Sequence, residues 1–461
     1  MKKNLAIARV TTTAIFGMTF SAAHAWDHTL KQTPDPAINA AVKTIKPAAI
    51  QADIEKLVSF GTRSTLSAQD PDSIAAGHGI GAAREWLKSQ FEQDSRECGG
   101  CLEVKTDEFV QEAGARVPQP TPLTNVYAVL KGSAPDWTRR IVLVTGHYDS
   151  RRTDVLDATG DAPGANDDAS GTAVSLESAH ALITAASKLK LRATIVFLAV
   201  PGEEQGLFGA KHFAQMAKQA GWNIEAVLNN DIVGGDKSPG QDSRVVRVFS
   251  EGIPGAADDK EIKLIRAVGG ESDSRSRELA RYVAEIGASY SPGVKPLMEF
   301  RPDRYLRGGD HMAFNDQGYA AVRFTEYREN FNHQHQNLRT ENGVEYGDTL
   351  KFVNFDYVAR VARLNATTLA ALAAAPAPPT EVKLVTSGLD NDSTLKWKPS
   401  DGASGYEILW RVTTAQTWEH VEKTRDATAT LKVSKDNVTF AVRAVDEAGH
   451  KSLPVEPVPE R

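Results

Sequence analysis

Cysteine is scarce in this sequence. Among 461 residues there are only two, Cys98 and Cys101, so any metal site must use other ligands. In an oxidising compartment two cysteines this close form a local disulfide. A thioredoxin-like redox pair is the alternative, but such a pair normally opens a helix. The Gly99-Gly100 pair between the cysteines indicates a turn, and this favours the disulfide.

Long apolar runs are also missing beyond the N-terminus. After residue 25 no stretch reaches the roughly 18 apolar residues of a membrane-spanning helix, which predicts a soluble mature protein. Residues 1–25 have two leading lysines, a short apolar stretch and a final Ala-His-Ala, a pattern typical of a secretory signal peptide. Arg9 interrupts the stretch and disfavours a membrane anchor. We therefore expect export to the periplasm or medium, and the Lys-Lys start is typical of bacteria.

The chain has no excess of positive charge. Loss of Lys2, Lys3 and Arg9 with the signal peptide would change the formal net charge from −6 to −9. An acidic exported protein is a poor candidate for nucleic-acid binding. The composition, 41% hydrophobic and 24% charged, is that of an ordinary globular protein, and the length allows more than one domain.

Apolar strand-like runs alternate with helical patterns between residues 141 and 330. The runs are 141–144, 194–200, 226–229 and 320–324. Continuous apolar strands interleaved with helices are typical of a sheet that is buried on both faces. The sequence therefore predicts an α/β fold in which helices sandwich a mixed, largely parallel sheet.

The composition changes near residue 371. The stretch "LAALAAAPAPPT" is rich in alanine and proline and predicts a linker over 371–379. Frequent turns then separate short strand-like runs, which predicts a small all-β sandwich over 380–461. The large domain is expected to span 26–370.

Imidazole and carboxylate side chains follow each of the four apolar runs. In chain order they are His147, Asp149, Glu203, Glu204, Asp231, His333 and His335. Sites in open α/β sheets gather at the carboxyl ends of the strands. We therefore expect these side chains to converge on one crevice.

Two adjacent aspartates, Asp167 and Asp168, lie in "PGANDDASGTA", between the first run and its helix. Alone, this pair would be a solvated turn, but here it falls on the same rim as the other acids. Clustered carboxylates raise one another's pKa, and divalent metal ions relieve that repulsion. Nitrogen and oxygen ligands without cysteine suit zinc or a similar first-row ion. One bridging carboxylate can hold two ions, and the turn makes Asp167 the natural bridge.

Two neighbouring glutamates in "PGEEQG" cannot both take the same role. If one of Glu203 and Glu204 binds metal, the other can act as general base. Their spacing alone does not assign the two roles.

Six motifs in order resemble the co-catalytic di-zinc aminopeptidase family. They are "GHYDS", "APGANDDASGTA", "PGEEQGLFGA", "NNDIVGGD", "GGDHMAFNDQGYAAVRFTE" and "FNHQHQN". This family includes secreted bacterial leucyl aminopeptidases and is related to glutamate carboxypeptidase and glutaminyl cyclase. The resemblance covers about residues 40–370. It implies a zinc exopeptidase fold, two Zn²⁺ or similar ions, and hydrolysis of peptides with a free N-terminus by a water that bridges the metals.

The resemblance also implies a role for each matching residue. His147 and Asp231 would bind one zinc, Asp167 would bridge, and Glu204 would bind the second zinc. Glu203 would be the general base. Beside them, Asp149 would orient His147, and Asp168 would follow the bridge, often after a cis peptide bond.

The second zinc also needs a histidine. In the family this histidine is usually followed four residues later by an acid or an amide. His333 with Asn337 fits this spacing, whereas Arg339 follows His335. This favours His333 as ligand and leaves His335 to line the substrate pocket. In "GGDHMAF", Asp310 and His311 match a pair that the family places at the cleft edge, which implies contact with substrate.

The C-terminal region resembles a fibronectin type III module in "PPTEVKLV", "LKWKP" and "GYEILWR". Such a module would contact a polymer or protein partner, or would serve as a stabilising appendage. Two alternatives stay open for the whole chain. The same metal site could act as a carboxypeptidase or an aminoacyl cyclase, although the complete ligand set disfavours a single-zinc cyclase. The chain could also be a non-catalytic binding protein, but an inert relative would have little reason to retain Glu203.

Overall fold

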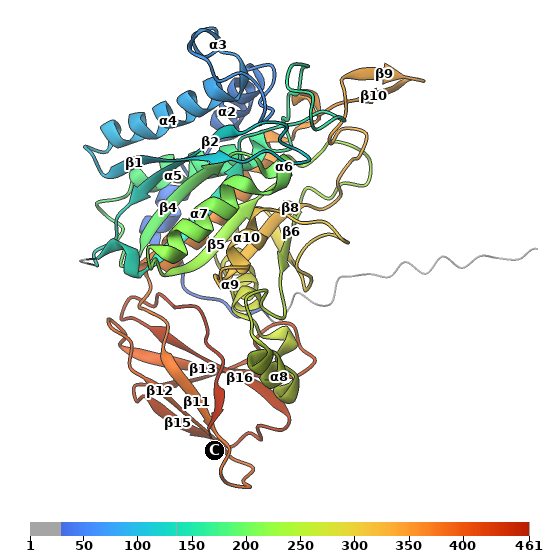
Figure 1. Cartoon of the computed structure of the whole chain (residues 1–461). Helices are drawn as coiled ribbons and strands as arrows, with labels where there is room; N and C mark the ends of the chain where they lie inside the picture. Colours follow the sequence, from blue (N-terminus) through green and yellow to red (C-terminus); the bar gives the residue numbers. More distant parts are fainter. Residues whose placement is uncertain (1–28, 135, 461) are drawn as a thin grey trace, which may run out of the picture.

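The computed structural model describes residues 29–134 and 136–460. The expected signal peptide over residues 1–25 lies outside this described part. Figure 1 shows a large α/β domain and, below it, a smaller all-β domain. Within the described residues, no helix is both long enough and apolar enough to cross a membrane.

An eight-stranded mixed sheet forms the centre of the large domain, in the order β1-β2-β4-β3-β5-β8-β6-β7. Its strands are β1 (Leu102–Gln111), β2 (Thr121–Leu130), β3 (Ile141–His147), β4 (Thr194–Val200), β5 (Ile224–Asn230), β6 (Val245–Ser250), β7 (Lys295–Glu299) and β8 (Ala321–Glu326). The inner strands β4, β3, β5 and β8 are mutually parallel. Strands β1 and β2 pair antiparallel with their neighbours, and β6 pairs antiparallel with β8 but parallel with β7. The predicted α/β fold is confirmed, and the four apolar runs are these four inner strands.

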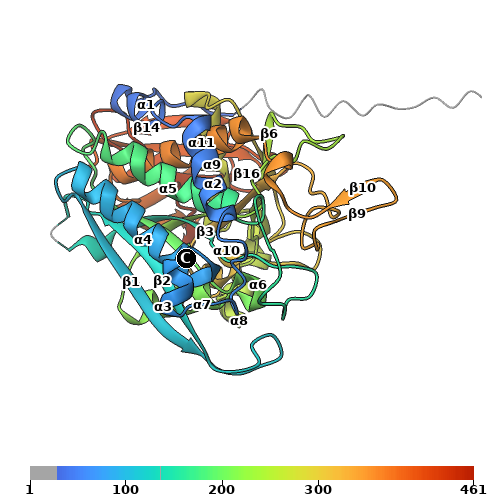
Figure 2. The same ribbon diagram turned by 90° about the horizontal axis from the view of Figure 1, so that it is seen from above.

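Helices cover both faces of the sheet. One face packs against α1 (Pro36–Val42), α2 (Pro47–Val58), α4 (Gly79–Glu97), α5 (Ala169–Ile183), α9 (Arg275–Tyr290) and α11 (Phe355–Ala374). The other packs against α7 (Phe208–Gln219) and α10 (Asp310–Asn315). Seen from above, α2, α4 and α5 lie beside one another (Figure 2). The remaining helices are α3 (Pro71–Ala75), α6 (Glu203–Gly206) and α8 (Asp259–Val268).

Strand β3 illustrates why the inner strands are apolar throughout. Val142 and Val144 face the α5 side, whereas Ile141 and Leu143 face the α7 side, because successive side chains of a strand point to opposite faces. Each such buried side chain contributes about 1.5–3 kcal/mol. The strand ends are therefore rigidly positioned.

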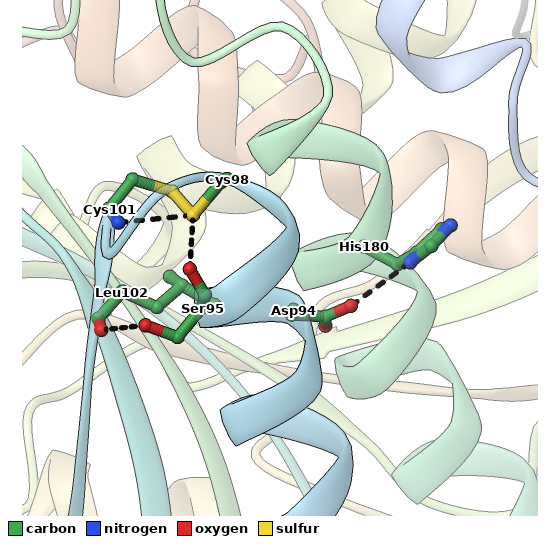
Figure 3. The surroundings of a disulfide bond; sticks show 6 residues. All are labelled: Asp94, Ser95, Cys98, Cys101, Leu102 and His180. Carbon is green, nitrogen blue, oxygen red and sulfur yellow. Dashed lines mark hydrogen bonds and ion pairs between the residues drawn. A yellow bond between two sulfur atoms is a disulfide. The ribbon is translucent and has the colours of Figure 1, made fainter.

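The two cysteines form a disulfide, as predicted, between the end of α4 and the start of β1 (Figure 3). Gly99 and Gly100 both have positive φ, 70° and 87°, which glycine adopts readily. Next to this turn, His180 Nδ1 of α5 lies 3.0 Å from Asp94 Oδ1 of α4. The disulfide thus stabilises only the turn between α4 and β1.

The C-terminal domain is built from two small sheets, as predicted for an all-β sandwich. One has the order β15-β12-β11-β17 and the other β14-β13-β16. The strands are β11 (Thr380–Val385), β12 (Ser393–Lys398), β13 (Gly405–Val412), β14 (His420–Thr424), β15 (Thr428–Leu431), β16 (Val438–Val445) and β17 (Val458–Glu460). Trp397, Ile408 and Phe440 pack between the sheets. The fibronectin type III resemblance itself stays a prediction.

The boundary between the domains differs from the predicted linker. Helix α11 continues to Ala374, so the first four residues of the segment 371–379 are helical and buried. Alanine has the highest helix propensity, and composition does not distinguish a buried alanine-rich helix from a linker. A short hairpin of β9 (Arg339–Glu341) and β10 (Val344–Tyr346) projects from the large domain (Figure 1).

Buried ion pairs join the two domains. Arg443 of β16 is fully buried; its Nη1 lies 2.6 Å from Glu285 Oε2 of α9, and its Nη2 lies 2.7 Å from Glu407 Oε2 of β13. Nearby, Arg411 of β13 pairs with Asp273 of the large domain. Buried ion pairs therefore hold the C-terminal sandwich against the large domain.

We expect Arg443→Met to lower the free energy of unfolding by about 3 kcal/mol, because it leaves buried carboxylates without their main partner. Lys451, 3.2 Å from Glu407, offsets part of the loss. The measurement is the thermal unfolding midpoint. Arg425→Met is the control, since Arg425 is exposed and has no ion pair within the described residues. Equal midpoints for the two variants would contradict the assignment.

Candidate metal centre

The parallel strands bring the predicted residues to one edge of the sheet. His147 is the last residue of β3, Glu203 and Glu204 open α6 after β4, and Asp231 follows β5. The turn before α5 supplies Asp167. All five lie at carboxyl strand ends or in the turn beside them, where the fold class leads us to expect a site.

Two groups of donor atoms meet at the carboxylate of Asp167. Oδ1 lies 3.2 Å from His147 Nε2, which is also 3.9 Å from Asp231 Oδ1. Oδ2 lies 2.9 Å from His335 Nε2, which is also 3.3 Å from Glu204 Oε2. The two oxygens of one carboxylate therefore face two different imidazoles, as a bridging ligand requires.

The donor spacing fits zinc. Ligands held tetrahedrally at about 2.0–2.2 Å from one ion lie about 3.3–3.6 Å from each other, and the four distances, from 2.9 to 3.9 Å, bracket this range. Among the described residues, Glu204 Oε1 is buried and has no hydrogen-bond partner. Buried polar atoms are normally paired, so this unpaired oxygen beside the other donor atoms is free to bind a metal ion.

Opposing effects act on the ionisation of this cluster. Burial by itself would raise the pKa of Asp167, but hydrogen bonds from His147 and His335 hold it well below its usual value. For Glu203, burial raises the pKa well above the usual value, the positive charge of His147 opposes the rise, and Asp231 adds to it. The cluster thus carries more buried acid than its histidines can neutralise, which is the condition that divalent cations relieve.

Asp149 lies behind the first group. Its Oδ1 is 3.3 Å from His147 Nδ1, and its carboxylate accepts hydrogen bonds from Thr65 Oγ1 at 2.8 Å and from the backbone N–H groups of Glu203 and Glu204. One carboxylate therefore orients the imidazole of His147 and fixes the turn that carries the two glutamates. This is the arrangement that outer partners of metal ligands commonly adopt.

Asp168 points away from the donor groups, although it is adjacent to Asp167. Its carboxylate accepts hydrogen bonds from the N–H groups of His147 at 3.0 Å and Gly171 at 2.9 Å, and so caps the N-terminus of α5. The Asp167–Asp168 peptide bond is cis, as the family resemblance implied. The two adjacent aspartates therefore have different roles: Asp167 faces the donor groups, and Asp168 caps α5.

The choice between His333 and His335 is corrected by the structure. His335 faces Asp167 and Glu204, whereas His333 Nδ1 hydrogen-bonds to Asp236 and its ring stacks on Phe352. His335 has φ 55°, an unusual left-handed conformation within the loop. The four-residue spacing between His333 and Asn337 favoured His333 in the sequence, but such a spacing carries no information about the backbone conformation of the loop.

Asp310 and His311 are also placed differently from the prediction. Both are fully buried, and neither lines the cleft above the donor groups. His311 Nε2 lies 2.8 Å from the carbonyl oxygen of Pro302, and burial raises the pKa of Asp310 to about 7. Their burial does not support the expected contact with substrate.

Two important residues were missed by the sequence reasoning. The carboxylate of Asp348 accepts hydrogen bonds from the backbone N–H groups of Asn166 at 2.8 Å and Asp167 at 2.7 Å. It therefore holds the turn that carries Asp167. Arg323 is fully buried, with Nη2 2.9 Å from Asp231 Oδ1. A charge inside the apolar run 320–324 was a usable signal, since a buried charge needs a partner. No local pattern marks Asp348.

A cleft of about 710 Å³ opens over the donor groups. Its floor includes Asp167, Glu203, Glu204 and Asp231, and its walls include Arg116, Arg151, Arg304, Arg307, Phe331 and His335. A larger groove lies between the domains and contains none of these residues. The smaller cleft is therefore the candidate substrate site, because it contains the candidate metal ligands.

Comparisons with known proteins agree with this geometry. The model of peptidase family M28 matches residues 125–354, a range that contains both donor groups. A probable zinc metalloprotease of Leptosphaeria maculans is 44% identical over 436 residues, which is 93% of this chain and 99% of the relative. Another, of Pyricularia oryzae, is 46% identical over 445 residues, with 93% and 86% covered. These relatives are fungal and add no support to a bacterial origin.

Solved structures support the fold. Two structures of LapA from Legionella pneumophila match with TM-scores of 0.50 and 0.52, each at 21% identity. They cover 73% and 75% of this chain, and 74% and 79% of their own chains. At that identity the likeness concerns the arrangement of strands and helices only.

We expect His335→Ala to lose about one equivalent of bound zinc, while His333→Ala keeps the wild-type content. Of these two histidines, His335 presents a ring nitrogen to the second group of donors, whereas the ring of His333 is bonded to Asp236. Metal content measured on both purified variants after dialysis checks this. The reverse result would restore His333 as the ligand and contradict the geometry.

Proposed function

The chain belongs to peptidase family M28, and on that premise we propose that it is a zinc exopeptidase that removes N-terminal residues from peptides with two metal ions. The observation that carries this proposal is the Asp167 carboxylate, which has one oxygen in each donor group. The names of the fungal relatives and the aminopeptidase activity attributed to LapA support the reaction class.

Two sets of residues would hold the ions. His147 and Asp231 would bind one ion, Glu204 and His335 the other, and Asp167 both. Zinc bound there supplies a Lewis acid that polarises the peptide carbonyl, and it lowers the pKa of water at the site. The buried strand ends hold these ligands close together in the fold.

The positions of the two glutamates support different roles for them, which sequence spacing alone did not assign. Glu204 is buried, and its Oε2 faces His335, which is the position of a ligand. Glu203 is half-buried, lines the cleft, and its carboxylate lies within 4.8 Å of the donor atoms of His147 and Asp231. In this proposal Glu203 takes a proton from the attacking water and passes it to the departing amine.

The first test of the proposal is Asp167→Asn. An amide offers one oxygen in place of two and no charge, so we expect zinc content to fall from two equivalents to at most one, with loss of peptide hydrolysis. Asp161→Asn is the control, because Asp161 is exposed on the same loop. Retention of two zinc equivalents by Asp167→Asn would contradict a shared bridge.

A second test separates binding from chemistry. We expect Glu203→Gln to keep its zinc and to lose about 10²–10⁴-fold in kcat, the usual contribution of a general base, because the amide cannot accept a proton. Glu204→Gln should lose zinc as well as activity. Kinetics on an amino-acid nitroanilide together with metal analysis compare the two, and an active Glu203→Gln enzyme would remove Glu203 from the proposed role.

A further inference from the structure

We propose that the cleft over the metal centre binds a carboxylate of the substrate through Arg116 and Arg151, so that the preferred peptides carry an anionic group beyond the residue that is removed. This inference rests on the proposed peptidase function and adds the substrate class to it.

Positive charge gathers at this cleft from three separate loops. Arg116 lies between β1 and β2, Arg151 follows β3, and Arg304 and Arg307 lie between β7 and α10. The chain as a whole carries a formal charge of −6, so this concentration runs against its overall charge. The carboxylates of the cleft floor are those assigned to metal binding and to Glu203, and metal ions would neutralise the ligands.

The four arginines differ in what already neutralises them. Arg304 is paired with Asp303 at 2.9 Å and with Glu329 at 2.6 Å. Arg307 shares Glu329 at 3.1 Å and keeps a third of its side chain exposed. These two therefore form a partly neutralised wall of the cleft.

Arg116 and Arg151 have no carboxylate partner among the residues that the structure describes. Arg116 Nη1 donates to the backbone oxygen of Glu204 at 3.0 Å. Arg151 donates to the backbone oxygens of Arg152 and Thr153, both at 2.9 Å. Carbonyl acceptors hold each guanidinium in place without cancelling its charge. Two positioned, uncompensated guanidinium groups therefore face one cleft.

A carboxylate is the ligand that this arrangement fits. The planar guanidinium presents paired donors that match the two oxygens of a carboxylate. Arg116 donates a hydrogen bond to the backbone of Glu204, whose side chain would bind metal, so its charge lies beside the proposed metal centre. Phe331, 63% exposed, lines the same cleft beneath Arg307, whose guanidinium carbon lies 5.8 Å from the ring centre. An apolar surface beside positive charge suits a peptide with an acidic group.

In a peptide this carboxylate has two sources, the C-terminus and an Asp or Glu side chain. Three substrates distinguish them: Leu-Gly-Gly, its C-terminal amide, and Leu-Gly-Glu amide. With the zinc-loaded protein, we expect at least one carboxylate peptide to have a kcat/KM about tenfold above that of Leu-Gly-Gly amide, which corresponds to 1.4 kcal/mol. The preference should weaken as salt is raised, since screening acts on exposed charges.

Arg151→Gln tests the residue. It should lower kcat/KM for the preferred carboxylate peptide about tenfold more than for the neutral amide, mainly through KM. Arg152→Gln is the matched control, because Arg152 pairs with Asp157 at 2.6 Å and does not line the cleft; its preference should equal that of wild type. Arg116→Gln should act like Arg151→Gln, with zinc content measured in parallel because Arg116 also holds the Glu204 backbone.

The outcomes separate the two levels of the proposal. Equal hydrolysis of all three peptides, or an Arg151→Gln variant that slows all three equally, overturns carboxylate recognition and leaves the peptidase function in place. Absence of hydrolysis of every peptide by the zinc-loaded protein overturns the peptidase function, and the substrate class falls with it.

Discussion

The site depends on one carboxylate that two imidazoles approach from opposite oxygens. Asp167 can hold this position because contacts of the surrounding backbone fix it. The carboxylate of Asp348 accepts hydrogen bonds from the N–H groups of Asn166 and Asp167, and Asp168 caps the helix that follows. A side chain alone could rotate away from the acids around it. The fixed backbone keeps the carboxylate in the cluster, and this leaves cations as the means of relieving the repulsion.

The sheet explains why the other donors converge on that carboxylate. Strands β3, β4 and β5 run parallel in the core and end at one edge, so residues more than 80 positions apart in the chain reach the same place. Arg323, at the centre of β8, adds a buried positive charge against Asp231. It can hold the aspartate oriented while sharing it with an ion. The stability of the core and the geometry of the site therefore have the same source.

Sequence patterns predicted the parts of this structure that are governed by local periodicity. The four inner strands are buried on both faces, so each one is an unbroken apolar run in the sequence. The glycines between Cys98 and Cys101 indicate a turn, so the disulfide could also be predicted. His335 was not predictable in this way, since it lies in a loop and has a positive φ that no local sequence pattern marks. Nor was the burial of Asp310 or of the helical residues 371–374, which depends on elements that are distant in the chain and leave no local pattern.

The contacts of the C-terminal domain favour a stabilising role over that of a freely tethered adhesive module. Its arginines Arg411 and Arg443 neutralise acids of the large domain that are buried at the junction, including Glu285 of α9. Helix α9 packs in turn on β6, β7 and β8, and β8 carries Arg323. Without the sandwich, α9 would expose an apolar and acidic surface close to the strand that supports the metal centre. The alignment with the Leptosphaeria relative, 436 residues long, is longer than residues 26–370, so the similarity to that relative extends into the sandwich.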